Sequence, residues 1–217
     1  MRANAIRFSA VVLAAGVSSR MQGRNKLLLP VGGETVIRRT VRNVLEAQPV
    51  ETVAVVGFEA AALTEALSSL PIHMHFNPRF EQGQMTSVAA GVSALRQLTD
   101  AVIVCLGDMV LLTAADYREL AQRHAQLVEQ SILVPQYRGQ RGNPVVFSSW
   151  RIPEVIAGRR NPGCRHLIAD HPEEVFNYHV AHDGFVTDLD TPEDYDRVLA
   201  RLGPTRGAFS VLSDRPT

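Results

Sequence analysis

Apolar runs and amphipathic stretches alternate along most of this chain, and this alternation constrains its fold more than any other feature. Continuous apolar runs at 8–15 (FSAVVLAA), 52–57 (TVAVVG) and 100–108 (DAVIVCLGD) are typical of strands buried on both faces of a sheet. Stretches with helical spacing of apolar residues lie between and after them, at 34–47, 59–70, 84–98 and 113–128. Strands that alternate with helices predict a mostly parallel sheet. We therefore expect an α/β fold, a single three-layer domain with a doubly wound sheet and helices on both faces.

The rest of the chain continues this pattern with shorter elements. Thr113 is placed to cap the helix that begins beside it, and Thr191 followed by Pro192 is a typical start for a last helix over 191–202. Further strands are expected at 72–76, 131–135, 143–147 and 174–180, and a short helix at 163–171. The expected domain is 1–202, and the polar segment 203–217, with two prolines, is expected to be a loosely ordered tail.

The chain carries 22 acidic and 22 basic residues, so its formal net charge is zero. This balance gives no general attraction to nucleic acid or to an anionic membrane, and any anion binding must be local. Cys105 lies in an apolar run and Cys164 in a polar one, and the pair forms neither a disulfide framework nor a metal-binding spacing. No run reaches the roughly 20 apolar residues of a membrane span. We expect a soluble, cytoplasmic protein with no nucleic-acid or membrane partner.

The loop after the first strand brings small, polar and cationic residues together in the sequence VVLAAGVSSRMQGRNK. Gly16 allows a ligand to approach the backbone, and Ser18 and Ser19 add hydroxyl groups beside successive N–H groups. Arg20 supplies a planar guanidinium and Lys26 a mobile point charge, which suit different phosphate oxygens. The spacing matches neither a Walker A loop nor a dinucleotide-binding G-x-G motif. The loop therefore predicts a phosphate site, with a solvated turn as the alternative.

Five segments, in order, resemble motifs of the molybdenum cofactor cytidylyltransferase family and its close relatives among the GT-A-like nucleotidyltransferases. LAAGVSSRMQGRNKLL is similar to the signature L-A-[AG]-G-x-[SG]-x-R-[ML]-…-K. GQMTSVAAGV (83–92) resembles the family's G-x-x-x-S segment, and GDMV (107–110) resembles its G-D-M-P. RGNPVVF (141–147) resembles its R-G-x-P, and DLDTPEDY (188–195) resembles its D-x-D-T-P-E-D-Y. The resemblance implies a nucleotide-diphospho-sugar transferase-like fold. It also implies Mg²⁺-dependent transfer of a nucleoside monophosphate to a phosphorylated acceptor, with release of pyrophosphate.

The resemblance also implies a set of site residues. Arg20, Lys26 and Asp108 would be the catalytic residues, with Arg20 and Lys26 on the departing pyrophosphate. The residues implied to contact the nucleotide are Leu13, Ala14, Ala15, Gly16, Ser18, Ser19, Asn77, Gly83 and Ser87. Ala15, in place of a glycine, narrows the base pocket and by resemblance favours a pyrimidine, hence CTP over GTP.

Two parts of the sequence offer carboxylates for the metal. Asp108 ends a buried strand at the edge of the sheet where ligands bind, and a carboxylate there suits Mg²⁺, although a turn or capping role is the alternative. Asp188 and Asp190 share a face if they lie on a strand. The resemblance favours Asp188 as the second metal ligand. Asp190 is then the alternative ligand, or a cap beside Thr191.

The acceptor implied by the resemblance is molybdopterin carrying molybdenum, and an apo-molybdoenzyme would then be a protein partner. The acceptor half departs from the family: Asn143 replaces the histidine of R-G-H-P, and RNPGCR stands where the family has G-D-x-G-A-R. The sequence therefore leaves open a nucleotidyltransferase for a sugar or polyol phosphate, a non-catalytic cofactor-delivery chaperone, and a reductase that uses a nicotinamide cofactor. A chaperone would not need the two metal carboxylates, and the missing G-x-G weakens the reductase.

Overall fold

The computed structural model describes residues 6–21, 23–157 and 164–203, so the expected tail beyond 203 lies outside the described residues. One eight-stranded sheet has the order β10-β7-β9-β6-β1-β4-β5, with β8 paired to β7 alone. Its strands are β1 (Phe8–Ala14), β4 (Glu51–Val56), β5 (His73–Phe76), β6 (Ala101–Leu106), β7 (Ile132–Tyr137), β8 (Gln140–Arg141), β9 (Val145–Ser148) and β10 (Val175–His179). A two-stranded ribbon pairs β2 (Pro30–Val31) with β3 (Glu34–Thr35).

The sheet is mostly parallel, as the sequence predicts. β1 lies between β6 and β4, parallel to both, and all seven of its residues are buried. β9 is antiparallel to β6 and to β7, and β8 is antiparallel to β7. The loops that follow β1 and β6 therefore leave the same edge of the sheet, where Leu13 pairs in register with Leu106.

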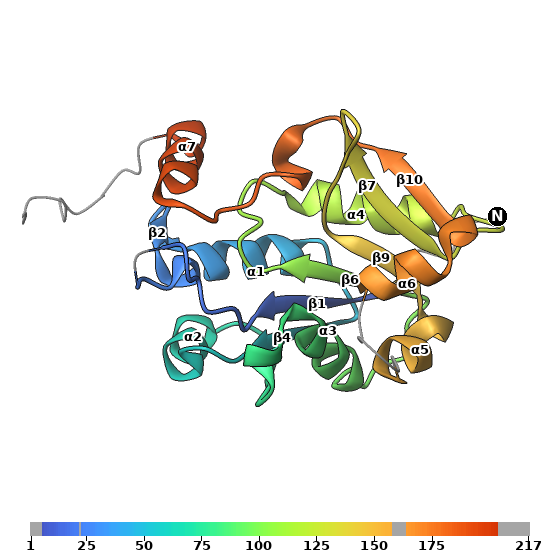
Figure 1. Cartoon of the computed structure of the whole chain (residues 1–217), viewed down its shortest axis with the longest axis horizontal. Coiled ribbons are helices and arrows are strands. Elements are labelled where there is room, and N and C mark those ends of the chain that lie inside the picture. Colours follow the sequence, from blue (N-terminus) through green and yellow to red (C-terminus); the bar gives the residue numbers. More distant parts are fainter. Residues whose placement is uncertain (1–5, 22, 158–163, 204–217) are drawn as a thin grey trace, which may run out of the picture.

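Helices cover both faces of the sheet (Figure 1). They are α1 (Val36–Glu46), α2 (Ala60–Leu67), α3 (Gln84–Ser93), α4 (Ala114–His124), α5 (Ile152–Ala157), α6 (Cys164–Asp170) and α7 (Pro192–Leu202). Successive residues of β1 point to opposite faces. Val12 packs in one core cluster with residues of α1, α2 and α4, and Val11 packs in the other with residues of α3, α5 and α6. The expected three-layer α/β domain is confirmed.

Local hydrogen bonds set helix ends that the apolar pattern does not specify. α1 begins at Val36, two residues later than the sequence pattern suggests, because Thr35 pairs in β3 and its hydroxyl accepts the N–H of Arg38. α3 ends at Ser93, earlier than expected, and the Glu51 carboxylate then accepts two backbone N–H groups from the turn that follows.

The predicted starts of the two capped helices are confirmed. Thr113 forms a capping box with Asp116 at the start of α4, and Thr191 forms one with Asp194 at the start of α7. Each box satisfies helix N–H groups that have no partner within the helix. The box at Thr191 also fixes the chain just after Asp190, which matters for the site described below.

Cys105 and Cys164 are both buried, and Cys164 lies in the short helix that the sequence predicts at 163–171. It is the first residue of α6 and packs in the same apolar cluster as Leu167, on the α3 face of the sheet. Burial raises the pKa of the Cys164 thiol to about 12. Its thiol is therefore not placed to approach a bound cofactor.

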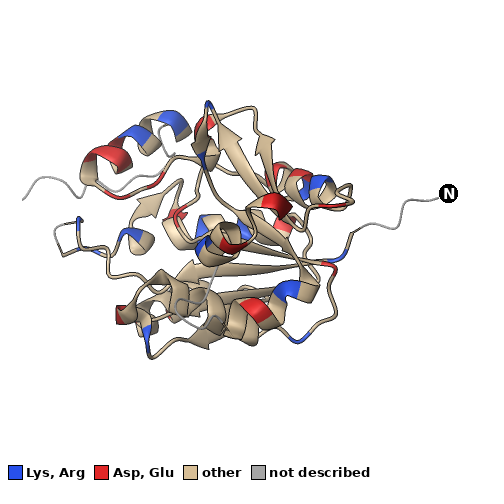
Figure 2. Cartoon of the chain, turned by 45° about the vertical axis from the view of Figure 1, so that its right-hand side comes forward, with Lys and Arg blue, Asp and Glu red and all other residues tan. Residues whose placement is uncertain are grey.

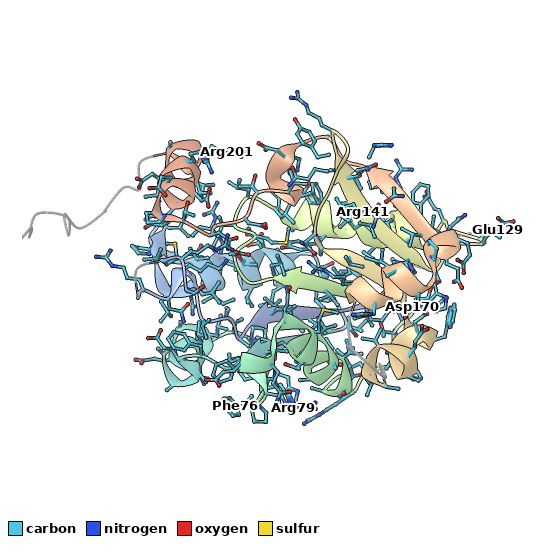
Figure 3. The ribbon with its side chains drawn as sticks, viewed as in Figure 1. Phe76, Arg79, Glu129, Arg141, Asp170 and Arg201 are labelled. Atoms are coloured by element: carbon cyan, nitrogen blue, oxygen red, sulfur yellow. The ribbon has the colours of Figure 1, made fainter. Side chains whose placement is uncertain are left out.

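The outer surface carries mixed charge. Along the ribbon in Figure 2, the positions of Lys and Arg are interspersed with those of Asp and Glu. The sheet ends at β5, where Phe76 is 53% exposed and lies at the outer edge of the molecule (Figure 3). Among the described residues, no helix is both long enough and apolar enough to span a bilayer.

Candidate active site

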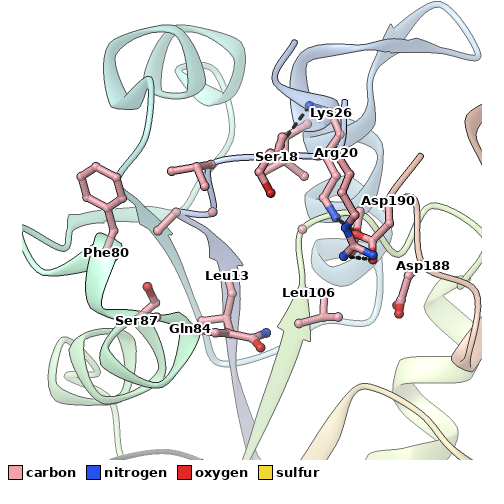
Figure 4. Close-up of a pocket in the computed structure, with 18 of the residues that line it drawn as sticks. Leu13, Ser18, Arg20, Lys26, Phe80, Gln84, Ser87, Leu106, Asp188 and Asp190 are labelled. Atoms are coloured by element: carbon pink, nitrogen blue, oxygen red, sulfur yellow. Dashed lines mark hydrogen bonds and ion pairs between the residues drawn. The ribbon is translucent and has the colours of Figure 1, made fainter. Parts of the chain in front are cut away.

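A cavity of about 590 Å³ opens where β1 and β6 end. Four parts of the chain line it: the loop after β1, the segment that leads into α3, the end of β6, and the C-terminal third (Figure 4). Its lining residues are Leu13, Ala15, Gly16, Val17, Ser18, Ser19, Arg20, Lys26, Leu27, Phe80, Glu81, Gly83, Gln84, Ser87, Leu106, Gly107, Asp108, Arg165, Asp188 and Asp190. The predicted phosphate loop and the predicted carboxylates thus lie in one cavity.

The loop after β1 presents a row of backbone N–H groups. Within the described residues, the N–H groups of 16–20 donate to no protein acceptor, whereas Met21 N–H donates to the Ser18 carbonyl at 2.9 Å. Ser18 has a positive φ of 51°, and its hydroxyl accepts the Lys26 N–H at 3.2 Å, which ties the two ends of the loop together. Successive N–H groups in such a turn form a concave site for an anion.

Gly16 leaves space in this cavity. A Cβ added at Gly16 would meet no protein atom within 4 Å, although the residue lines the cavity wall. The glycine is therefore not needed for packing. A side chain there would occupy volume that is open to a ligand.

The two cations of the loop are held by carboxylates from distant parts of the chain. Lys26 Nζ donates to Asp108 Oδ2 at 2.5 Å and to Asp190 Oδ1 at 2.8 Å, and Arg20 Nη2 donates to Asp190 Oδ2 at 2.6 Å (Figure 4). Burial alone would lower the pKa of Lys26, but Asp108 and then Asp190 outweigh it and raise that pKa. Lys26 is therefore fully charged at neutral pH.

Asp188 is the carboxylate of this cluster that no cation holds within the described part of the chain. Its side chain is open to the cavity, but the wall around it desolvates the carboxylate, and this raises its pKa, with the negative charges of Asp108 and Asp190 adding to the effect. A carboxylate that is desolvated and close to a second one is a favourable ligand for a divalent cation. Asp108 and Asp188 therefore fit the Mg²⁺ site that the sequence predicts.

Asp190 does not cap α7. The cap is formed by Thr191 and Asp194, and Asp190 contributes only its backbone N–H, which donates to Asp194 Oδ2 at 3.2 Å. The Asp190 side chain faces the other way and pairs with Arg20 and Lys26. The capping interpretation of Asp190 is therefore wrong.

The structure brings most of the predicted site residues to the cavity wall. Those that line it are Leu13, Ala15, Gly16, Ser18, Ser19, Arg20, Lys26, Gly83, Ser87, Asp108 and Asp188. Ala14 and Asn77 are absent from the lining. Ala14 is fully buried on the opposite face of β1, and the Asn77 amide donates to the hydroxyls of Thr86 (2.9 Å) and Ser87 (3.0 Å). Asn77 thus braces the wall from behind.

The remaining lining residues have no role that the sequence predicts. These are Val17, Leu27, Phe80, Glu81, Gln84, Leu106, Gly107 and Arg165. Leu106 and Gly107 adjoin the predicted carboxylate and could have been found from strand ends. Arg165 lies in the divergent RNPGCR segment and comes to the cavity only because α6 packs beside α3.

The sequence profile of the MobA-like NTP transferase domain matches residues 10–175, which include the loop, the α3 wall and Asp108. The chain belongs to this family. The MobA-like chain is 28% identical to the molybdenum cofactor cytidylyltransferase of Escherichia coli strain K12, over 85% of this chain and 92% of that protein. It is 31% identical to the purine catabolism protein PucB of Bacillus subtilis strain 168, over 87% and 94%.

The solved structures agree with this assignment. A nucleotidyl transferase from Methanothermobacter superimposes with a TM-score of 0.79 and 24% identity, over 90% of this chain and 97% of that one. This likeness confirms the nucleotidyltransferase fold that the resemblance implies. Family and fold together make this MobA-like chain a nucleotidyltransferase.

Proposed function

We propose that this enzyme transfers CMP from CTP to a phosphorylated acceptor, in a Mg²⁺-dependent reaction that releases pyrophosphate, with the molybdenum cofactor as the acceptor. One observation carries the proposal: the N–H groups of 16–20, which have no protein acceptor among the described residues, and the carboxylates of Asp108 and Asp188 line the same cavity. The first group suits a polyphosphate and the second a divalent cation. The cytidylyltransferase relative supports CTP and the molybdenum cofactor as substrates.

The proposed reaction needs little covalent help from the protein. An acceptor phosphate oxygen attacks the α-phosphorus of CTP, a new P–O bond forms, and the bond to the β-phosphate breaks as pyrophosphate leaves. A phosphomonoester is already ionised at neutral pH, so no general base is required. The enzyme's contribution is to position the two substrates and to stabilise negative charge.

The loop residues would hold the leaving group. The N–H groups of 16–20 donate to the β- and γ-phosphates, and Arg20 and Lys26 neutralise charge on the pyrophosphate as it leaves. Asp108 and Asp188 would hold Mg²⁺, which when bound supplies charge neutralisation at the reacting phosphates. Lys26 is already charged and lies between the loop and Asp108, so it needs only a change of partner to serve the nucleotide.

The base would lie against the α3 wall. Ala15 and Phe80 both line the cavity, and both pack against Gly57, where no space is left for a Cβ. The preference for a pyrimidine rests on Ala15, which stands where the related motif allows a glycine. Ala15→Gly should therefore widen the pocket and raise the relative turnover of GTP.

The acceptor would lie along the C-terminal wall, where Arg165 is available. Arg165 is exposed, lines the cavity, and has no carboxylate partner among the described residues, whereas Arg20 and Lys26 are both ion-paired. An unpaired guanidinium suits the phosphate of an acceptor. This assignment would hold for a sugar or polyol phosphate as well as for a pterin cofactor.

The test is pyrophosphate release measured with CTP, GTP, ATP and UTP, each with and without Mg²⁺. Each nucleotide is paired in turn with molybdenum cofactor, a sugar 1-phosphate and a polyol phosphate. The proposal predicts Mg²⁺-dependent release with CTP and molybdenum cofactor. Release only with a sugar or polyol phosphate would replace the acceptor, and no release with any pair would refute nucleotidyl transfer by this site.

Gly16→Ala tests whether the nucleotide lies on the loop after β1. Because the new Cβ meets no protein atom, the variant should keep its thermal stability. Its KM for CTP should rise, since the methyl group enters the space beside the N–H row. Unchanged KM would show that the nucleotide does not lie on this loop.

A further inference from the structure

Asp190 holds both cations that the proposed triphosphate site depends on. Its Oδ2 accepts from Arg20 at 2.6 Å and its Oδ1 accepts from Lys26 at 2.8 Å, so both oxygens are engaged. Arg20 and Lys26 come from the loop after β1, whereas Asp190 lies just before α7. The contact therefore closes the loop onto the C-terminal wall of the cavity.

The position of Asp190 is fixed by its neighbours. Leu189 is fully buried in the core, and the backbone N–H of Asp190 donates to Asp194 within the capping structure of α7. Arg20, by contrast, has a side chain that is 67% exposed. When a ligand enters, Arg20 can leave Asp190 more easily than Asp190 can leave Arg20, whereas Lys26, with a side chain only 19% exposed, has to change partners within the cavity.

The net charge of the cavity lining disfavours binding of a polyphosphate that carries no metal ion. The lining carries three cations, Arg20, Lys26 and Arg165, against four carboxylates, Glu81, Asp108, Asp188 and Asp190. A site for a triphosphate thus has a net negative lining. A polyphosphate without a counter-ion would have to displace Asp190 from both loop cations and also face the carboxylate of Asp188, which forms no ion pair in the described part of the chain.

We propose that Asp190 is a positioning residue that keeps Arg20 and Lys26 engaged until a polyphosphate arrives together with a divalent cation. The inference rests on the proposed function. With a cation on Asp108 and Asp188, the lining is no longer negative, Lys26 is released from Asp108, and the two loop cations can turn from Asp190 to the phosphates. Asp190 thereby makes polyphosphate binding conditional on the metal.

The experiment is calorimetry of inorganic tripolyphosphate with the full chain, in EDTA and in Mg²⁺. Tripolyphosphate removes any contribution from the base. In EDTA, Asp190→Asn should bind at least about ten-fold more tightly than wild type, a difference of about 1.4 kcal/mol. Mg²⁺ should increase affinity strongly for wild type and much less for Asp190→Asn.

Asp188→Asn is the matched control. It removes the same charge from the same cavity, but it releases no ion-paired cation, because the described ion pairs of Arg20 and Lys26 are with Asp108 and Asp190 and not with Asp188. Its gain in EDTA should be several-fold smaller than that of Asp190→Asn. Asp190→Glu, which keeps the charge, should stay close to wild type, and thermal denaturation establishes that each variant is folded.

Two outcomes would overturn the proposal, and they differ in what else they refute. If wild type binds tripolyphosphate in Mg²⁺ but Asp190→Asn gains no more than Asp188→Asn in EDTA, the role of Asp190 is refuted and the proposed function stands. If wild type and all variants fail to bind tripolyphosphate even in Mg²⁺, both proposals are refuted.

Discussion

Replacing Lys26 by methionine tests the charge cluster most directly. Methionine keeps the length and apolar stem of the side chain but removes its charge. Asp108, only 5% exposed, would lose the ammonium group that lies 2.5 Å away, while Asp188 and Asp190 remain close by. Removing one partner of a buried ion pair costs about 3–5 kcal/mol.

The structure places the expected loss at the lower end of that range. Asp190 keeps Arg20 as a partner, and the Lys26 side chain is 19% exposed, so water can reach the position that its ammonium group leaves. We therefore expect a loss of about 3 kcal/mol. For a chain of this length, that loss lowers the melting temperature by about 6–12 °C in metal-free buffer.

The loss of stability in Lys26→Met should be smaller under two conditions. On the proposed function, saturating Mg²⁺ would bind the folded state and replace the missing positive charge. Acid would reduce the repulsion between the carboxylates by protonating them. The pKa of Lys26 is raised in the folded chain, so its own stabilising charge is complete below the unfolded value of about 10.4 and is lost only as pH rises through the folded pKa. Any change below neutral pH in the stability difference between wild type and Lys26→Met therefore comes from protonation of carboxylates.

The assay is thermal and urea denaturation of wild type and Lys26→Met, with and without Mg²⁺, from pH 5 to 8. Arg24→Met is the control, because Arg24 is an exposed cation of the same loop with no side-chain partner among the described residues. It should change stability by less than about 0.5 kcal/mol. Equal stability of the two variants, or a deficit that neither Mg²⁺ nor acid reduces, would refute the described role of the charge cluster.

Three further changes test other parts of the site. Asp108→Asn can still accept from Lys26 and should keep the fold, but Mg²⁺-dependent turnover should fall by at least about 100-fold; normal turnover would remove Asp108 from the metal site. Asp188→Asn should stabilise the metal-free protein at pH 7, because the raised pKa of Asp188 means that its ionised form opposes folding. This gain in the free energy of unfolding should vanish below about pH 4, where the carboxyl group is protonated in both states. Urea denaturation at several pH values measures the gain, and a gain that persists in acid would contradict this reasoning. In steady-state kinetics, Arg165→Gln should raise KM for the acceptor and leave KM for CTP unchanged. Arg96→Gln, which changes another exposed arginine, is the control. An equal rise in KM for both substrates would assign Arg165 to the nucleotide.

The sequence by itself determined the layers and one half of the site. Long apolar runs such as 8–15, in which Ser9 is the one polar residue, have no alternating polar face to turn to water, so β1 had to be central and covered on both sides. Parallel strands place their following loops at one edge, which brought the loop after β1 beside Asp108. Thr191 and Pro192 fixed the start of α7 through local hydrogen bonding alone.

Only the tertiary structure decided how distant charges pair and which side chains reach the cavity. An apolar run reads the same in both directions, so nothing in 143–147 indicated that β9 is antiparallel. Asn77 lies close to the site in sequence but turns inward, because the hydroxyls of Thr86 and Ser87 satisfy its amide.

Asp190 is the clearest example of a contact that the sequence alone does not predict. Its neighbours in sequence suggest a helix cap, but its partners lie 164 and 170 residues away. Ion pairing depends on separation in space, and a sequence specifies that separation only through the complete fold.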